Sequence, residues 1–169
     1  MTTETQSPVA KTLATQLEFT YNVFQTNTTG IDHAMSLKQP GDTGNCINWI
    51  GGHILAARQT MMLMFDQPEI WDLDARKRYG RGSDPIIREG EGRSWDEILA
   101  EFAKSQDQLR AGFAAATPEM LAAPLPPDRN PFEMENQGQM LAGLCFHEAY
   151  HVGQLGIVRR LIGLDSAIG

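Results

Sequence analysis

Apolar residues recur every three or four positions in four separate segments of this chain, and no convincing strand pattern lies between them. The segments are about 20 residues long, which corresponds to more than five turns of α-helix each. A helix with one apolar face must bury that face against another element. The sequence therefore predicts an all-α fold, a four-helix bundle with long loops between the helices.

Residues that cap helices mark where the predicted helices begin and end. Pro8 after a serine is typical of a helix start, and Ser94 with Glu97 forms an S-x-x-E capping box. We expect the first helix to continue until the polar stretch that begins at Gln39. The other helices are expected over residues 45–65, from residue 94 onward, and over residues 136–162, where Gly163 ends the last one.

Two of the three connections look long. Residues 67–93 are rich in charge and glycine, and the segment from Pro124 to Pro131 is rich in proline. A long loop in a compact domain is usually functional or mobile, so we expect these segments to shape any binding site. A simple up-down-up-down order of the helices is not assured. The length of 169 residues suits a single domain over residues 1–169.

The net charge of −7 makes nucleic acid a poor partner, because such a surface repels phosphate backbones. No apolar run approaches the roughly 20 residues that span a bilayer, and residues 1–8 lack the pattern of a secretory signal. We therefore expect a cytoplasmic protein that contacts neither membrane nor nucleic acid. Cys46 and Cys145 lie among apolar residues, and we expect both to be buried as free thiols.

Three of the four histidines fall on predicted inward faces. His147 and His151 are four residues apart, so they project from the same side of the last helix, and His53 lies on the inward face of the second. An unpaired buried polar group costs about 1–3 kcal/mol. A divalent metal ion would satisfy all three imidazoles, and three ligands with an open position are typical of catalytic zinc. Hydrogen-bonded core histidines are the alternative. His33 is expected to be solvated.

The same segment, His147-Glu148-Ala149-Tyr150-His151, spells H-E-x-x-H, the zinc-peptidase motif. A metzincin requires glycine three residues after the second histidine and a third histidine three residues further on, and this chain has Gln154 and Ile157 there. A thermolysin-like site requires a later glutamate, whereas Asp165 is the only acid after His151. A metallopeptidase is therefore a remote alternative.

Three stretches of the sequence carry a resemblance to a known family. They are Asn48-Trp49-Ile50-Gly51-Gly52-His53, Tyr79-Gly80-Arg81-Gly82, and His147-Glu148-Ala149-Tyr150-His151-Val152-Gly153-Gln154-Leu155. On these residues the chain resembles the DinB/YfiT-like superfamily over nearly its whole length. The resemblance implies a bundle with an unusual chain order, a divalent metal held by His53, His147 and His151, and a homodimer.

Members of that superfamily include S-transferases and isomerases that use mycothiol, bacillithiol or glutathione. The resemblance thus implies a metal-dependent thiol transferase that acts on a small molecule. A site with net charge +2 lowers the pKa of a bound thiol and so creates the nucleophilic thiolate. Zinc is the expected metal, with nickel, iron and copper as alternatives for imidazole ligands.

Four further residues are candidates for the site. Glu148 is predicted as a general base, with a surface or interface carboxylate as the alternative. Gln154 is predicted to orient a ligand or line the pocket, and Tyr79 and Arg81 to contribute to the substrate pocket. Two other functions stay open: a bundle that binds a metal or small ligand without turnover, and a purely structural dimer with buried histidines.

Overall fold

The computed structural model describes residues 6–168 except 43, 127–129 and 131. Within these residues the fold contains helices and no strand, which confirms the all-α prediction. The helices are α1 (Pro8–Thr28), α2 (His33–Ser36), α3 (Ile47–Met64), α4 (Leu73–Arg78), α5 (Trp95–Ala115), α6 (Pro118–Ala122) and α7 (Gln137–Leu161). No helix in this part of the chain has both the length and the apolar character needed to cross a membrane.

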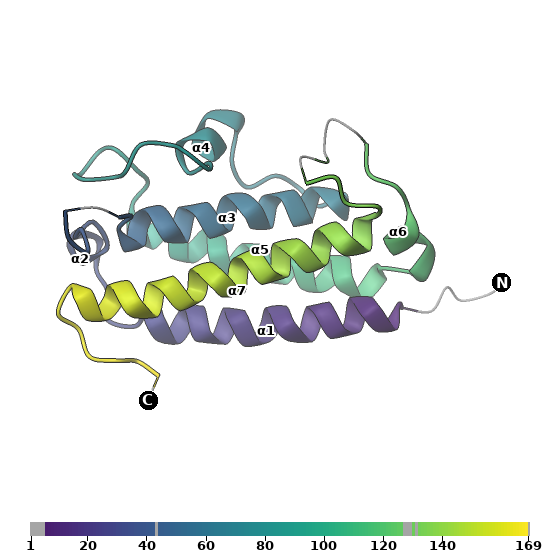
Figure 1. The fold of residues 1–169 in the computed structure, drawn as a ribbon, viewed down its shortest axis with the longest axis horizontal. Helices are drawn as coiled ribbons and strands as arrows, with labels where there is room; N and C mark the ends of the chain where they lie inside the picture. The colour runs from purple at the N-terminus through teal and green to yellow at the C-terminus, as the bar shows by residue number, and fades with distance from the viewer. Residues whose placement is uncertain (1–5, 43, 127–129, 131, 169) are drawn as a thin grey trace.

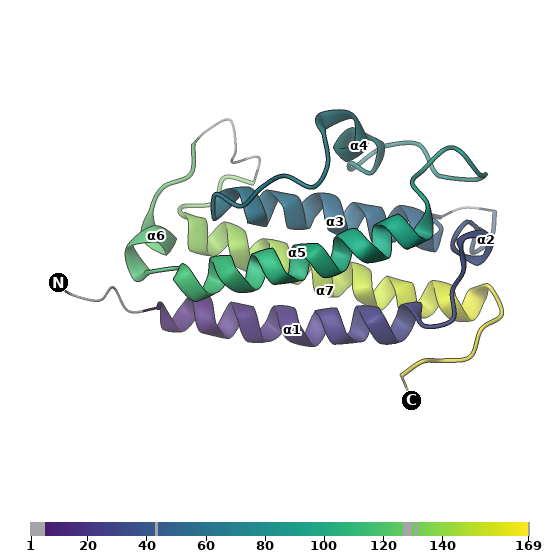
Figure 2. The same ribbon diagram turned by 180° about the vertical axis from the view of Figure 1, so that it is seen from behind.

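The four long helices α1, α3, α5 and α7 lie side by side around a common core (Figure 1). Helix α1 packs against α5 and α7, and α3 packs against the same two helices, so α1 and α3 are diagonal. Helices α1 and α7 run in one direction and α3 and α5 in the other (Figure 2). The connection over residues 65–94, which carries α4, returns along the length of α3. This long return explains why the order is not a simple succession of hairpins.

The predicted capping box of α5 and the predicted start of α7 are confirmed. The Ser94 hydroxyl accepts a hydrogen bond from the backbone N–H of Glu97, and the Glu97 carboxylate accepts from the backbone N–H of Ser94. Asn136 caps the start of α7. After α7 the chain turns at Gly163, whose φ of 94° is accessible to glycine at no steric cost.

Two details of the predicted connections are wrong. The first helix ends at Thr28 instead of continuing toward Gln39, because the chain turns at Gly30 (φ 75°). Asp32 then caps the separate short helix α2. His33 opens α2 and is half-buried, and its Nδ1 accepts a hydrogen bond from the backbone N–H of Trp95, so it is not the solvated residue that we expected.

The other connections agree with the sequence in part. The segment 67–93 was expected as a loop, but it contains α4, whose start is capped by Asp72. Between α5 and the proline-rich segment, Thr117 caps the short helix α6. Of the proline-rich segment that begins at Pro124, residues 127–129 and 131 lie outside the described residues.

Two glycines in the middle of α3 permit close approach by its neighbours. A Cβ atom on Gly51 would lie 2.8 Å from the Trp95 ring, and one on Gly52 would lie 2.2 Å from the Tyr79 ring. Glycine lowers helix stability by about 1 kcal/mol relative to alanine. The close packing of Trp95 and Tyr79 explains why glycine nevertheless occupies both positions. The absence of a side chain at Gly52 lets the loop after α4 rest on α3 immediately beside His53.

Candidate metal centre

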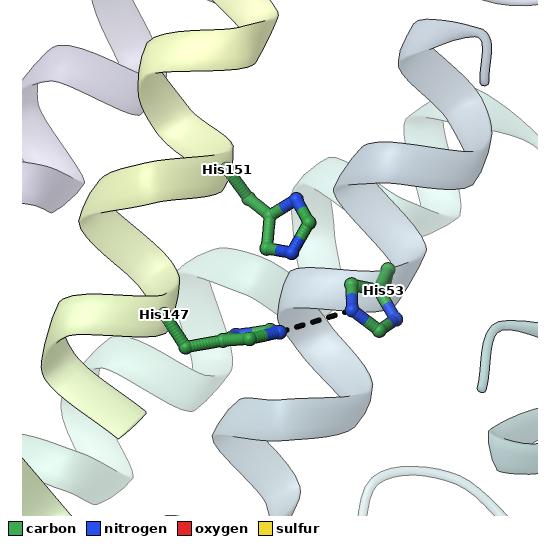
Figure 3. Close-up of side chains that lie close together, drawn as sticks. All are labelled: His53, His147 and His151. Atoms are coloured by element: carbon green, nitrogen blue, oxygen red, sulfur yellow. Dashed lines mark hydrogen bonds between the residues drawn. The ribbon is translucent and has the colours of Figure 1, made fainter. Parts of the chain in front are cut away.

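His53, His147 and His151 come together where α3 packs against α7 (Figure 3). Each offers one ring nitrogen, and these nitrogens all lie within 4.8 Å of one another. His147 and His151 share one face of α7 because a step of four residues advances a helix by slightly more than one turn. All three rings are half-buried, so the cluster is partly shielded from water and remains accessible.

The spacing of the nitrogens suits a shared metal ion. Nε2 of His53 lies 3.0 Å from Nε2 of His147. Two nitrogens bound to one tetrahedral zinc ion at about 2.05 Å are roughly 3.3 Å apart. The two ligand atoms therefore need to separate only slightly to admit an ion.

Hydrogen bonds on the outer side of two imidazoles fix which nitrogen carries the proton. Nδ1–H of His53 donates to the backbone carbonyl of Tyr79 (2.7 Å), and Nδ1–H of His151 donates to Oε1 of Gln154 (2.7 Å). A carbonyl oxygen only accepts, so in both neutral rings Nε2 is left unprotonated. This arrangement, a ligand histidine held by an acceptor on its far side, is typical of metal sites.

His147 differs from the other two histidines. Its Nδ1 is buried and has no hydrogen-bond partner in the described structure. Because His53 carries its proton on Nδ1, the contact between the two Nε2 atoms requires His147 to donate from Nε2. A metal ion would take the place of that single proton, and the proton of His147 would then reside on Nδ1. The residues present thus fit a metal bound through three Nε2 atoms.

Burial keeps all three imidazoles in the neutral form that binds metals. Desolvation is the main cause that lowers the pKa of each ring. For His147, desolvation and the neighbouring His151 and His53 lower the pKa to about 4. At neutral pH all three rings are therefore uncharged, and His147 has only to move its proton from Nε2 to Nδ1 to bind a metal.

Trp49 is a contributor to the site that the sequence reasoning did not identify. Its ring stacks on His53 with centroids 4.6 Å apart, and its Nε1–H donates to Oγ of Ser83 (2.9 Å). Trp49 precedes His53 by four residues, a spacing that places both on one side of α3. That spacing could have identified Trp49 from the sequence. Nothing in the sequence indicates the contact with Ser83, because it depends on how the loop folds.

Glu148 does not occupy the position that was predicted for a general base. It is 1% exposed, and its two carboxylate oxygens accept hydrogen bonds from Arg58 (2.7 and 2.8 Å) and from Thr20 (2.9 Å). One step along a helix turns the side chain by about 100°, which carries Glu148 from the histidine face of α7 into the core. The geometry thus argues against Glu148 as the base, and the peptidase alternative loses the residue on which it depends.

The two loop candidates have different surroundings. The Tyr79 side chain is 1% exposed; its hydroxyl donates to Oδ1 of Asn48 (3.1 Å) and accepts from the backbone N–H of Arg93 (2.7 Å). Tyr79 therefore anchors the loop, and it reaches the site through its backbone carbonyl instead of its ring. Arg81 is exposed on the same loop, and its role in substrate binding stays a prediction.

Comparison with known proteins adds one match. The family model of the DinB superfamily matches residues 16–155, a span that contains all three histidines and Gln154. No curated protein matches the chain.

Proposed function

The chain belongs to the DinB superfamily, and on this basis, together with the converging imidazoles, we propose that it binds one divalent metal ion through His53, His147 and His151. The observation that carries the proposal is the set of three nitrogens within 4.8 Å of one another, two of them on rings whose far side is held by an acceptor. Zinc suits three imidazoles best, and nickel, iron and copper are the alternatives.

We further propose that the protein is a metal-dependent transferase that uses a low-molecular-weight thiol to attack a small electrophilic molecule. When bound, the metal would supply the positive charge that lowers the pKa of a thiol. The protein's own contribution is to hold neutral ligands in place. Tyr79 and Gln154 fix the orientation of His53 and His151, and Trp49 covers one side of His53.

A non-catalytic role in metal or small-ligand binding is the second candidate. The position of Glu148 favours this role, because its carboxylate binds Arg58 in the core. Among the described residues, the cluster that could hold the metal consists of three histidines and has no carboxylate to accept a proton. In the transferase proposal, the thiol proton passes to solvent, which reaches the half-buried rings.

Turnover of a thiol separates the two candidates. Metal-loaded protein is assayed with mycothiol, bacillithiol, glutathione and cysteine against a generic electrophile, and loss of free thiol is followed over time. The transferase proposal predicts a rate above background with at least one thiol and no such rate in His147→Ala. Inactivity with every thiol at full metal loading would favour the binding role.

A cytoplasmic homodimer is part of the same proposal. An exposed apolar row along α7 supports a second copy as partner, formed by Phe146, Tyr150, Ile157 and Leu161. Light scattering at micromolar concentration is expected to give twice the mass of one chain, and the mass of one chain would contradict it.

A further inference from the structure

A buried ion pair lies next to the proposed metal ligands. Arg58 of α3 and Glu148 of α7 are 0% and 1% exposed, and the guanidinium donates two hydrogen bonds to the carboxylate, from Nε to Oε2 (2.8 Å) and from Nη2 to Oε1 (2.7 Å). A bidentate contact of this kind restricts both the distance and the relative orientation of the two side chains, whereas a single hydrogen bond restricts orientation less.

The other two long helices also contact the pair. The Thr20 hydroxyl of α1 donates to Oε1 of Glu148 (2.9 Å), and Nη1–H of Arg58 donates to Oγ of Ser105 in α5 (2.9 Å). The guanidinium carbon lies 3.9 Å from the centre of the Phe102 ring. All four long helices thus contribute a side chain to one buried polar cluster.

The pair joins the two helices that carry the histidines. Glu148 directly follows His147 on α7, and Arg58 follows His53 by five residues on α3, a rise of about 7.5 Å along the helix. Around this pair the two helices also bury apolar side chains, among them Leu55, Leu144 and Val152, which cannot form hydrogen bonds. The two hydrogen bonds of the ion pair, in contrast, join α3 directly to α7 within the core.

Stability alone does not account for two charges in the core. Replacing a buried ion pair by apolar side chains of similar volume often leaves stability unchanged or increases it, because the desolvation penalty disappears. A buried polar contact can instead specify how two helices align, as a single polar residue does in coiled coils. Arg58 and Glu148 lie beside the histidines, so aligning α3 with α7 would also align His53 with His147 and His151.

We propose that the Arg58–Glu148 pair is a positioning device for the metal centre. It fixes the register of α3 against α7, so that Nε2 of His53 meets the nitrogens of His147 and His151 at the spacing a metal ion needs. Neither residue contacts the metal. This inference rests on the proposed function, because it requires a metal at the three histidines.

The test removes both charges together, so that no unpaired charge is left in the core. The double variant Arg58→Met/Glu148→Leu is compared with a control, Arg110→Met/Glu18→Leu, which removes an ion pair between α5 and α1, two helices without ligands. The affinity of each protein for Co²⁺ is measured by competition with a chelator. The visible absorption of bound Co²⁺ is recorded as well, because it reports the coordination geometry.

We expect the double variant to keep its helical circular dichroism while its Co²⁺ affinity falls about ten- to a hundredfold, as for other residues that orient metal ligands. Its Co²⁺ absorption spectrum should also change. The control should keep the affinity of the unmodified protein within about twofold, because the pair that it removes is exposed.

Unchanged affinity and spectrum in a folded double variant would overturn the positioning role and leave the metal site itself intact. If the unmodified protein binds no Co²⁺ at the histidines, the proposed function fails instead. Should the double variant not fold, Arg58→Lys replaces it, because lysine keeps the charge and lacks the planar fork. The same loss of affinity in Arg58→Lys supports the proposal, and unchanged affinity overturns it.

Discussion

At the scale of single residues, the nitrogen that carries the proton determines which nitrogen of each histidine is free to bind a metal. His53 and His151 keep the Nδ1 proton because a carbonyl oxygen faces it, and their Nε2 atoms are free. Among the described residues His147 has no such acceptor, and its buried Nδ1 is unpaired. In the metal-free protein His147 therefore donates its Nε2 proton to Nε2 of His53.

The lowered pKa values make the metal-free protein sensitive to acid. An unfolded histidine binds a proton near its ordinary pKa of about 6.5, whereas His147 in the folded protein does so only near pH 4. Between these values the unfolded state binds more protons, so the free energy of unfolding must fall as the pH decreases through that window. Urea denaturation at pH 7 and pH 5 measures the loss. We expect a smaller loss in His147→Leu, and an equal loss in both proteins would contradict this account.

The two cysteines should be chemically inert in the folded protein. Cys46 and Cys145 are at most 1% exposed, and burial raises the pKa of both thiols, that of Cys145 to about 12. Because the thiolate is the reactive form, iodoacetamide at pH 8 should label neither cysteine in native protein and both in guanidinium chloride. Rapid labelling of either residue in the native protein would disprove the predicted burial.

At the scale of helices and loops, the features that depend on neighbours in sequence were predictable. The capping box of α5, the start of α7 and the spacing of His147 and His151 follow from residues within one or two turns. The environment of Glu148 did not follow, because its partner Arg58 lies 90 residues away in sequence. The contribution of the Tyr79 carbonyl was also out of reach, since it depends on how the loop after α4 lies on α3.

Gly52 links that loop to the histidine cluster. In Gly52→Ala the added methyl group would lie 2.2 Å from the Tyr79 ring, so the ring and the carbonyl that holds His53 must move. We expect a loss of about 1–3 kcal/mol in the free energy of unfolding and a weaker affinity for zinc. Gly143→Ala in α7 is the control, because its methyl group meets Met134 at an ordinary 3.7 Å. Equal behaviour of the two variants would argue against the coupling.

Removing one partner of the buried ion pair should destabilise the fold far more than removing both. Glu148→Leu alone leaves the guanidinium of Arg58 unpaired in the core, which costs about 3–5 kcal/mol. The double variant Arg58→Met/Glu148→Leu should recover most of that loss. Chemical denaturation of the single and double variants measures the difference, and strictly additive losses would refute the pairing.

At the scale of the whole molecule, the long connection over residues 65–94 shapes the site. It lets α3 and α5 run in the same direction and places α4 and the Tyr79 loop over the side of α3 that carries His53. The four amphipathic segments predicted the bundle. The long loops left the order of its helices open, and the family resemblance implied an unusual order. The order itself is set by contacts between segments far apart in sequence, such as α1 with α7, which periodicity does not encode.

Zinc titration of metal-free protein tests the central claim most directly. Isothermal titration calorimetry should give one zinc ion per chain for the unmodified protein and for His33→Asn, which alters the histidine outside the cluster. His53→Ala, His147→Ala and His151→Ala should each weaken binding at least about a hundredfold, because two imidazoles remain to hold the ion. No zinc binding by the unmodified protein, or undiminished binding by His147→Ala, would contradict the account.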